Sequence, residues 1–96
     1  VKGHEQSGFR PVLVMQNNTL NKNLSTVIVA PITANLKAKD KLTTFFLPIE
    51  VSKLDKDSVA LLFQLRAIDK IRLTKNVSVL PAECFKEILS QLRLVF

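Results

Sequence analysis

Short apolar runs, many of them β-branched, recur along this chain and limit what it can fold into. The first lies at residues 10–16, the clearest at 26–30 and a third at 43–47, and each has the length of a single strand. Pro31 follows the second run, where a proline is expected to end regular strand pairing or to mark a sheet edge. Such runs within 96 residues predict one mainly β domain with a small core.

The second half of the chain continues this pattern. Residues 58–68 are apolar, with Gln64 and Arg66 alternating late in the run, which predicts a long fourth strand, although the period alone also fits a helix. Residues 69–70 are expected to turn the chain, and residues 71–73 and 77–79 to form two further short strands. Polar connections at residues 17–25, 36–42 and 48–56 separate the runs.

One amphipathic helix is expected at residues 81–94. Proline suits its first position, and Glu83 in the first turn favours the helix dipole. The single cysteine, Cys84, is interpreted as a buried structural thiol. Short strands followed by one terminal helix favour a small barrel or half-barrel with the helix packed on it. Four apolar residues at helical spacing form the stripe that contacts the core or a second copy: Phe85, Ile88, Leu89 and Leu92.

The composition excludes several kinds of site. One histidine and one cysteine leave no intramolecular disulfide and no zinc cluster, so neither a metal nor a cofactor is expected. The formal net charge of +6 suits a polyanionic partner such as nucleic acid or an acidic protein segment, although many domains are basic for no specific reason. No apolar run approaches the length of a membrane span, and no signal peptide is expected at residues 1–4.

Two polar segments are candidates for binding. Residues 3–8 are bounded by glycines and are predicted to form a loop, and Arg10 stands where this loop meets the first strand. That arrangement fits an anion site, and it also fits an ordinary turn with a surface arginine. The basic connection at residues 36–42 is either a solvated loop or a binding loop.

Four blocks of sequence are spread in order along nearly the whole chain: GHEQSGFRPVLV at 3–14, VAPIT at 29–33, DSVALL at 57–62 and QLRAIDKIRL at 64–73. Together they resemble the MazF/PemK family of bacterial toxins. The resemblance implies a small SH3-like barrel with a C-terminal helix, of the PemK/MazF and CcdB-like plasmid-toxin type, working as a homodimer in the bacterial cytoplasm. It also implies a sequence-specific, ribosome-independent endoribonuclease that cuts single-stranded RNA and is held inactive by a MazE-like antitoxin with an acidic or amphipathic tail.

By motif position, the family's catalytic arginine and threonine fall on Arg10 and Thr33, and Glu5 matches the glutamate of its active-site loop. A guanidinium makes forked hydrogen bonds to phosphate, and a threonine hydroxyl can donate to the same oxygens, although Thr33 on residue type alone is an ordinary strand residue. Glu5 is a candidate base, and His4 a candidate base or acid. The residues expected to contact RNA are His4, Gln6, Lys37, Lys39 and Gln64.

Family members usually carry a first strand before the glycine loop, so this chain is expected to be a single toxin domain lacking that strand, with one barrel edge unpaired. Two other functions stay open. One is a non-catalytic toxin of the CcdB type, which binds a protein target such as DNA gyrase, and the weaker one is a plain RNA-binding barrel. The pairing of Arg10 with Thr33 favours the nuclease. Its reaction would be attack of the RNA 2′-hydroxyl on the adjacent phosphorus, without a metal ion.

Overall fold

The structure, a computed structural model, describes residues 2–5, 10–15 and 24–95, and for residues 2–5, 74, 75 and 95 only the backbone. The strands within these ranges are β1 (Lys2–Glu5), β2 (Pro11–Val14), β3 (Thr26–Thr33), β4 (Thr44–Leu47), β5 (Ser58–Leu61), β6 (Arg66–Asp69) and β7 (Leu73–Ser78). The helices are η1 (Leu36–Ala38), α2 (Ile49–Ser52), η2 (Leu62–Gln64), η3 (Lys70–Arg72) and α3 (Ala82–Val95), the η elements being single 3-10 turns.

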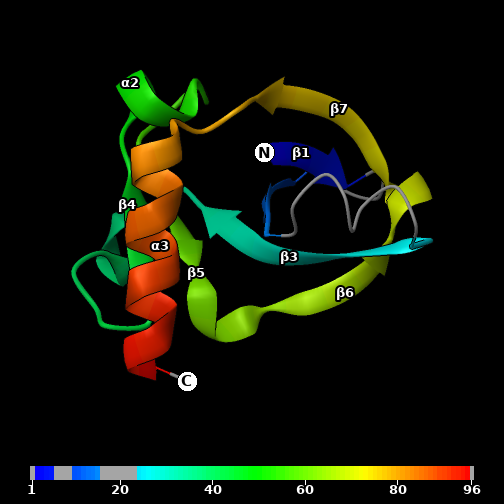
Figure 1. Cartoon of the computed structure of the whole chain (residues 1–96). Coiled ribbons are helices and arrows are strands. Elements are labelled where there is room, and N and C mark those ends of the chain that lie inside the picture. Colours follow the sequence, from blue (N-terminus) through cyan, green and yellow to red (C-terminus); the bar gives the residue numbers. More distant parts are fainter. Residues whose placement is uncertain (1, 6–9, 16–23, 96) are drawn as a thin grey trace.

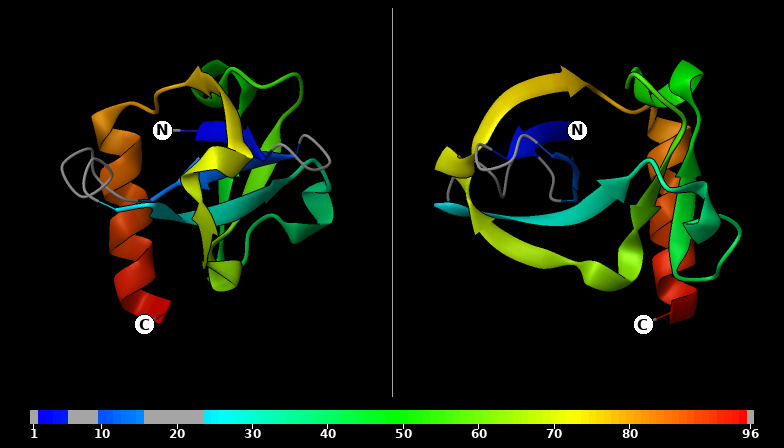
Figure 2. Two further views of the ribbon diagram at one scale, coloured as in Figure 1. Left: turned by 90° about the vertical axis from the view of Figure 1, so that its right-hand side faces the viewer. Right: turned by 180° about the vertical axis from the view of Figure 1, so that it is seen from behind.

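All strand pairs in the described ranges are antiparallel, in the order β4-β5-β3-β2-β1-β7, with β6 paired to β3 beside β5. The sheet curves strongly: β7 arches over β1 while β3 and β6 run beneath, and α3 lies against β4 and β5 at the other end of the molecule (Figures 1 and 2). The predicted fold class, a mainly β, barrel-like domain with a C-terminal helix, is confirmed.

The strand β3 is the centre of the fold because it pairs with three other strands. One edge is taken by β2, and the other first by β6 and then by β5. Thr33 pairs with Val59 on β5. Alternate residues of β3 direct their backbone groups to the β5 edge, and the residue two positions before Thr33 is Pro31, which has no N–H to donate. Pairing between β5 and β3 stops here, the chain continues as the turn η2, and it pairs with β3 again from Arg66, which lies opposite Val29. Pro31 therefore ends strand pairing on the β5 edge of β3, as expected, but not on the β2 edge, where it pairs with Val12.

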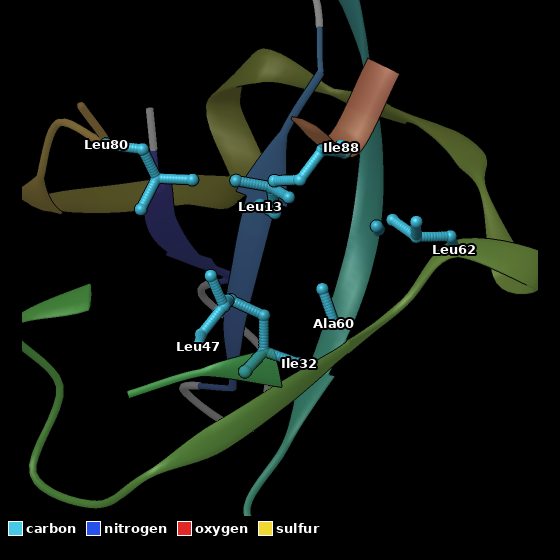
Figure 3. Packing of buried hydrophobic residues seen from close by; sticks show 8 residues of the cluster. Leu13, Ile32, Leu47, Ala60, Leu62, Leu80 and Ile88 are labelled. Atoms are coloured by element: carbon cyan, nitrogen blue, oxygen red, sulfur yellow. The ribbon is translucent and has the colours of Figure 1, made fainter. Parts of the chain in front are cut away.

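Two clusters of buried side chains lie on opposite faces of β2 and β3, because successive strand residues point to opposite sides. One is covered by α3, and Figure 3 shows Leu13 and Ile88 converging in it from β2 and the helix. Burying apolar surface in two layers stabilises a sheet that one small core would not hold alone. The members of the helix-covered cluster are Leu13, Ala30, Ile32, Leu47, Ala60, Leu62, Leu80 and Ile88. The members of the second are Val12, Val14, Val27, Val29 and Ile68.

The helix α3 begins one residue after its predicted start, and the face it buries is rotated from the predicted stripe. Ile88 is fully buried, and Cys84 and Leu92, four residues away on either side, pack against the same cluster. Leu89, predicted to belong to the stripe, is 42% exposed. Cys84 is half-buried rather than buried. None of the helices in the described ranges is long and apolar enough to cross a membrane.

Several local predictions are wrong, and each has a physical reason. The long strand at 58–68 is divided into β5, η2 and β6 because its partner β3 offers no donor at Pro31. The strands expected at 71–73 and 77–79 are instead the turn η3 and the single strand β7, which pairs with β1. The connection at 48–56 contains α2, whose Ile49 N–H donates to the Asp57 carboxylate at 2.9 Å.

The start of the chain also differs from the prediction. Residues 3–5 belong to β1 rather than to a loop, and β1 pairs with β2 on one edge and β7 on the other. Residues 6–9 of the predicted loop, and 16–23 of the polar connection at 17–25, lie outside the described residues. The absence of the family's first strand stays a prediction.

Candidate functional site

A cavity of about 560 Å³ opens on the face of β3 that is not covered by α3. Its polar side chains come from β3, from η2, from β6 and from the residue just before β2, and apolar residues of these segments complete the lining. Such a concave surface with a few convergent polar groups is the usual form of a ligand site. The described residues that line it are Arg10, Pro11, Val12, Pro31, Ile32, Thr33, Ala34, Leu61, Gln64 and Arg66.

Strand register sets Arg10 beside Thr33. β2 and β3 pair Val12 with Pro31, and continuing this antiparallel register by two residues places Arg10 opposite Thr33. Directly opposed residues on antiparallel strands have Cβ atoms about 5 Å apart on the same face. The two residues expected to be catalytic therefore meet at one end of the cavity, where both strands leave the sheet.

Thr33 is held by a short hydrogen-bonded turn. The Asn35 N–H donates to Thr33 Oγ1 at 3.1 Å, and the Lys37 N–H donates to Asn35 Oδ1 at 3.1 Å, which caps η1. A hydroxyl that accepts from a backbone N–H keeps its own hydrogen for donation to another group. Thr33 is half-buried, so this hydrogen is available to a ligand in the cavity while its oxygen is fixed in place.

The 3-10 turn η2 and the start of β6 supply the opposite wall of the cavity. Gln64, which the sequence predicts to lie close to the site, ends η2, is exposed and lines the cavity. Arg66 is the first residue of β6 and also lines the cavity. The sequence does not single out Arg66, because its alternation with Gln64 predicts only a long strand. The only available signal was that two polar side chains two residues apart share one face of an extended chain.

The predicted lysines lie beside the cavity rather than in it. Lys37 is exposed, and Lys39 places its Nζ 4.4 Å from the centre of the Phe46 ring, a cation–π contact. Phe46 pairs with Val59, which pairs with Thr33, so Phe46 and Thr33 share one face of the sheet. Lys39 therefore stands over the same face as the cavity, two strands away.

His4 and Glu5 are placed only by their backbone. His4 pairs with Pro11, and the register continued by one residue sets Glu5 opposite Arg10. Gln6 lies outside the described residues. Among the described residues that line the cavity there are two arginines and no carboxylate, and no group of three or more metal-binding side chains occurs in the described ranges. The two arginines of the described lining suit an anionic ligand.

Comparison with known proteins identifies the family. The sequence profile described as PemK-like, MazF-like toxin of type II toxin-antitoxin system matches residues 1–96. The endoribonuclease MazF of Staphylococcus saprophyticus is 49% identical over 90 residues, which are 92% of this chain and 73% of that protein.

Solved structures agree. The crystal structure of MazF from Deinococcus radiodurans has a TM-score of 0.72 at 28% identity, over 97% of this chain and 81% of that one. The Mycobacterium tuberculosis toxin MazF-mt6 has a TM-score of 0.86 at 22% identity, over 99% and 94% of the two chains, and at this identity the likeness concerns the fold. The family resemblance seen in the sequence is confirmed: the chain belongs to the PemK-like, MazF-like toxins of type II toxin-antitoxin systems.

Proposed function

We propose that this toxin cuts single-stranded RNA at particular internal sequences, without the ribosome and without a metal ion. Endoribonuclease activity follows from the 49% identity to an endoribonuclease over most of the chain. The observation that supports the finer proposal is the convergence of Arg10, Thr33 and Gln64 on one cavity.

The reaction we assign is an internal transesterification of the RNA backbone. The 2′-oxygen attacks the adjacent phosphorus and forms a new P–O bond, while the bond from phosphorus to the 5′-oxygen of the next nucleotide breaks. One proton leaves the 2′-hydroxyl and one reaches the departing 5′-oxygen. The upstream product then ends in a 2′,3′-cyclic phosphate, and the downstream product begins with a 5′-hydroxyl.

Arg10 binds the phosphate that is cut. Its guanidinium donates two parallel hydrogen bonds to phosphate oxygens, which gather negative charge as the 2′-oxygen attacks. The hydroxyl of Thr33, opposite Arg10 in the register, donates a further hydrogen bond to the same oxygens. Fixed donors of this kind accelerate a reaction by roughly 10²–10³-fold each.

Proton transfer is assigned to the start of the chain. Glu5, whose backbone lies opposite Arg10 by continued register, is the proposed base, and His4 is the second candidate. Gln64 and Gln6 are proposed to contact bases, and Lys37 and Lys39 to attract the strand through its charge. The guanidinium of Arg10 carries out the charge neutralisation that a metal ion performs in other nucleases.

Two partners follow from the family. A solved structure described as an endoribonuclease in complex with its cognate antitoxin, from mycobacterial species, has a TM-score of 0.80 at 14% identity. We propose that this chain too binds a cognate antitoxin, through an acidic or amphipathic MazE-like segment that neutralises it, and that it forms a homodimer in the bacterial cytoplasm. The net charge of +6 favours an acidic partner.

The test is end-group analysis of a short RNA incubated with the pure protein in excess chelator, without ribosomes. Wild type should leave a cyclic phosphate and a 5′-hydroxyl, and a single deoxyribose before the cut should abolish cleavage. Arg10→Ala should remove most turnover, and Arg10→Lys should restore only part of it, because an ammonium lacks the planar fork. Cleavage of the deoxy-substituted RNA, or full activity of Arg10→Ala, would refute this mechanism. No cleavage of any RNA would instead favour the CcdB type of toxin.

A further inference from the structure

The segment between β3 and β4 has Thr33 at its first end and little apolar packing to hold it in place. Residues 34–37 and 39–42 are exposed, and η1 buries none of its three residues. A segment with so little buried apolar area depends on hydrogen bonds for its order. At the first end these are the bonds around Asn35, whose N–H donates to Thr33 Oγ1 and whose side chain caps η1.

The side chain of Thr44 holds the other end of η1. Thr44 is buried at the start of β4, and its Oγ1 donates to the carbonyl of Ala38, the last residue of η1, at 2.7 Å. The Lys41 carbonyl, at 3.2 Å, is the more distant acceptor, and the Lys41 N–H donates back to Oγ1 at 3.3 Å. Since η1 is a single turn of three residues, bonds at both ends fix it as a unit.

Gln91 joins this segment to the C-terminal helix. Its Nε2 donates to the carbonyl of Leu42 at 2.7 Å and to that of Thr44, and lies 3.5 Å from the carbonyl of Lys41. An amide nitrogen carries two hydrogens, so the two nearer carbonyls use both. Gln91 itself stands on a fixed support, because α3 is anchored in the core through the fully buried Ile88, one turn earlier.

We propose that Gln91 and Thr44 are positioning residues, which act through the turn η1 to set the Thr33 hydroxyl for the reaction. The hydrogen bonds run from α3 to the start of β4, from the Thr44 hydroxyl to the end of η1, and from the residue that caps η1 to Thr33 Oγ1. This inference rests on the catalytic part proposed for Thr33. It adds a side chain of the C-terminal helix that lies outside the described lining of the cavity and does not touch the reacting atoms.

A positioning role predicts a loss in kcat smaller than that for removing the hydroxyl itself. Gln91→Ala should lower kcat on a short RNA by roughly 10-fold, with little change in KM, because a donor displaced by a fraction of its bond length still binds but stabilises the developing charge less well. Gln91→Glu keeps the volume of the side chain and offers no donor while ionised, so it should be at least as slow. Thr44→Val should behave in the same way, and Thr44→Ser, which keeps a hydroxyl, should recover the rate.

The matched control is Ser78→Ala. Ser78 Oγ also donates to a backbone carbonyl at 2.7 Å, but Ser78 lies outside the described lining of the cavity and outside the bonds that lead to Thr33. Ser78→Ala should therefore lose stability without losing kcat in the folded protein.

The decisive measurement repeats Gln91→Ala in a chain that already carries Thr33→Val. The hydroxyl through which Gln91 acts is then absent, so the second change should cost no further kcat, whereas an effect on folding alone would be the same in both backgrounds. Amide hydrogen exchange gives a second readout that needs no RNA. The N–H groups of Asn35 and Lys37 should exchange faster in Gln91→Ala than in wild type, and at the wild-type rate in Ser78→Ala.

Equal losses of kcat in the two backgrounds, or unchanged exchange of the Asn35 N–H in Gln91→Ala, would overturn this inference while cleavage by wild type upholds the proposed function. If wild type cuts no RNA, the proposed function and this inference fail together. Should Gln91→Ala fail to fold, both measurements are made with Gln91→Glu.

Discussion

Replacing Thr33 by valine tests the link between its turn and its chemistry. Valine keeps the β-branched shape but removes Oγ1, which accepts the Asn35 N–H at 3.1 Å. That bond is exposed, so water can replace it, and the net loss in the free energy of unfolding should be about 1 kcal/mol or less. For a domain of 96 residues this lowers Tm by roughly 4–8 °C at most, and the protein stays folded during the assay.

Turnover should fall much further than stability. Losing one donor to the developing charge costs roughly 10²–10³-fold in kcat, measured on a short RNA under saturating conditions. Thr33→Ser, which keeps a hydroxyl, should recover most of the rate. Asn35→Ala is the matched control, since it removes the cap of η1 at a cost of about 1 kcal/mol but leaves the Thr33 hydroxyl intact. If Thr33→Val turns over as fast as Asn35→Ala, the hydroxyl has no catalytic part and the reasoning fails.

Three further results are expected. Leu13→Ala, at a fully buried position under α3, should lower the free energy of unfolding by about 2–5 kcal/mol in a denaturant titration, and a loss below about 1 kcal/mol would contradict the packing described. Ser78→Ala should cost about 1–3 kcal/mol by the same titration, because Ser78 Oγ donates to the buried Ser52 carbonyl at 2.7 Å, and an unchanged midpoint would mean that this bond is not formed. Cleavage should survive excess chelator, and activity that returns only with one divalent ion would contradict the metal-free mechanism.

The local sequence pattern predicted those strands and helices whose position depends mainly on their own residues. β2, β4 and α3 lie within a residue or two of their predicted positions, because apolar alternation and a helical stripe are properties of the segment itself. The division of 58–68 was not predictable in this way, since its cause is Pro31 on another strand. β7 was also missed, because it contains polar residues such as Asn76 and pairs with β1 through an irregular register.

The site was less visible than the fold. Resemblance to the family predicted Arg10 and Thr33 as site residues, whereas residue type alone predicted a surface arginine and a strand threonine. Arg66 had no motif of its own, and only the register that sets it opposite Val29 brings it into the cavity. Strand pairing between residues far apart in the sequence built the site, and a local pattern does not contain that information.

Pro31 lies where the edge of β3 is left unpaired between β5 and β6, and this affects how an extended peptide could bind there. An unpaired stretch inside a sheet is a template on which an extended peptide can dock as an additional strand, using main-chain hydrogen bonds. Pro31 has no backbone N–H, so it cannot donate the hydrogen bond that such a peptide would need where the pairing between β3 and β5 stops. An extended peptide would therefore lack one of the main-chain partners that strand addition at this edge of β3 requires.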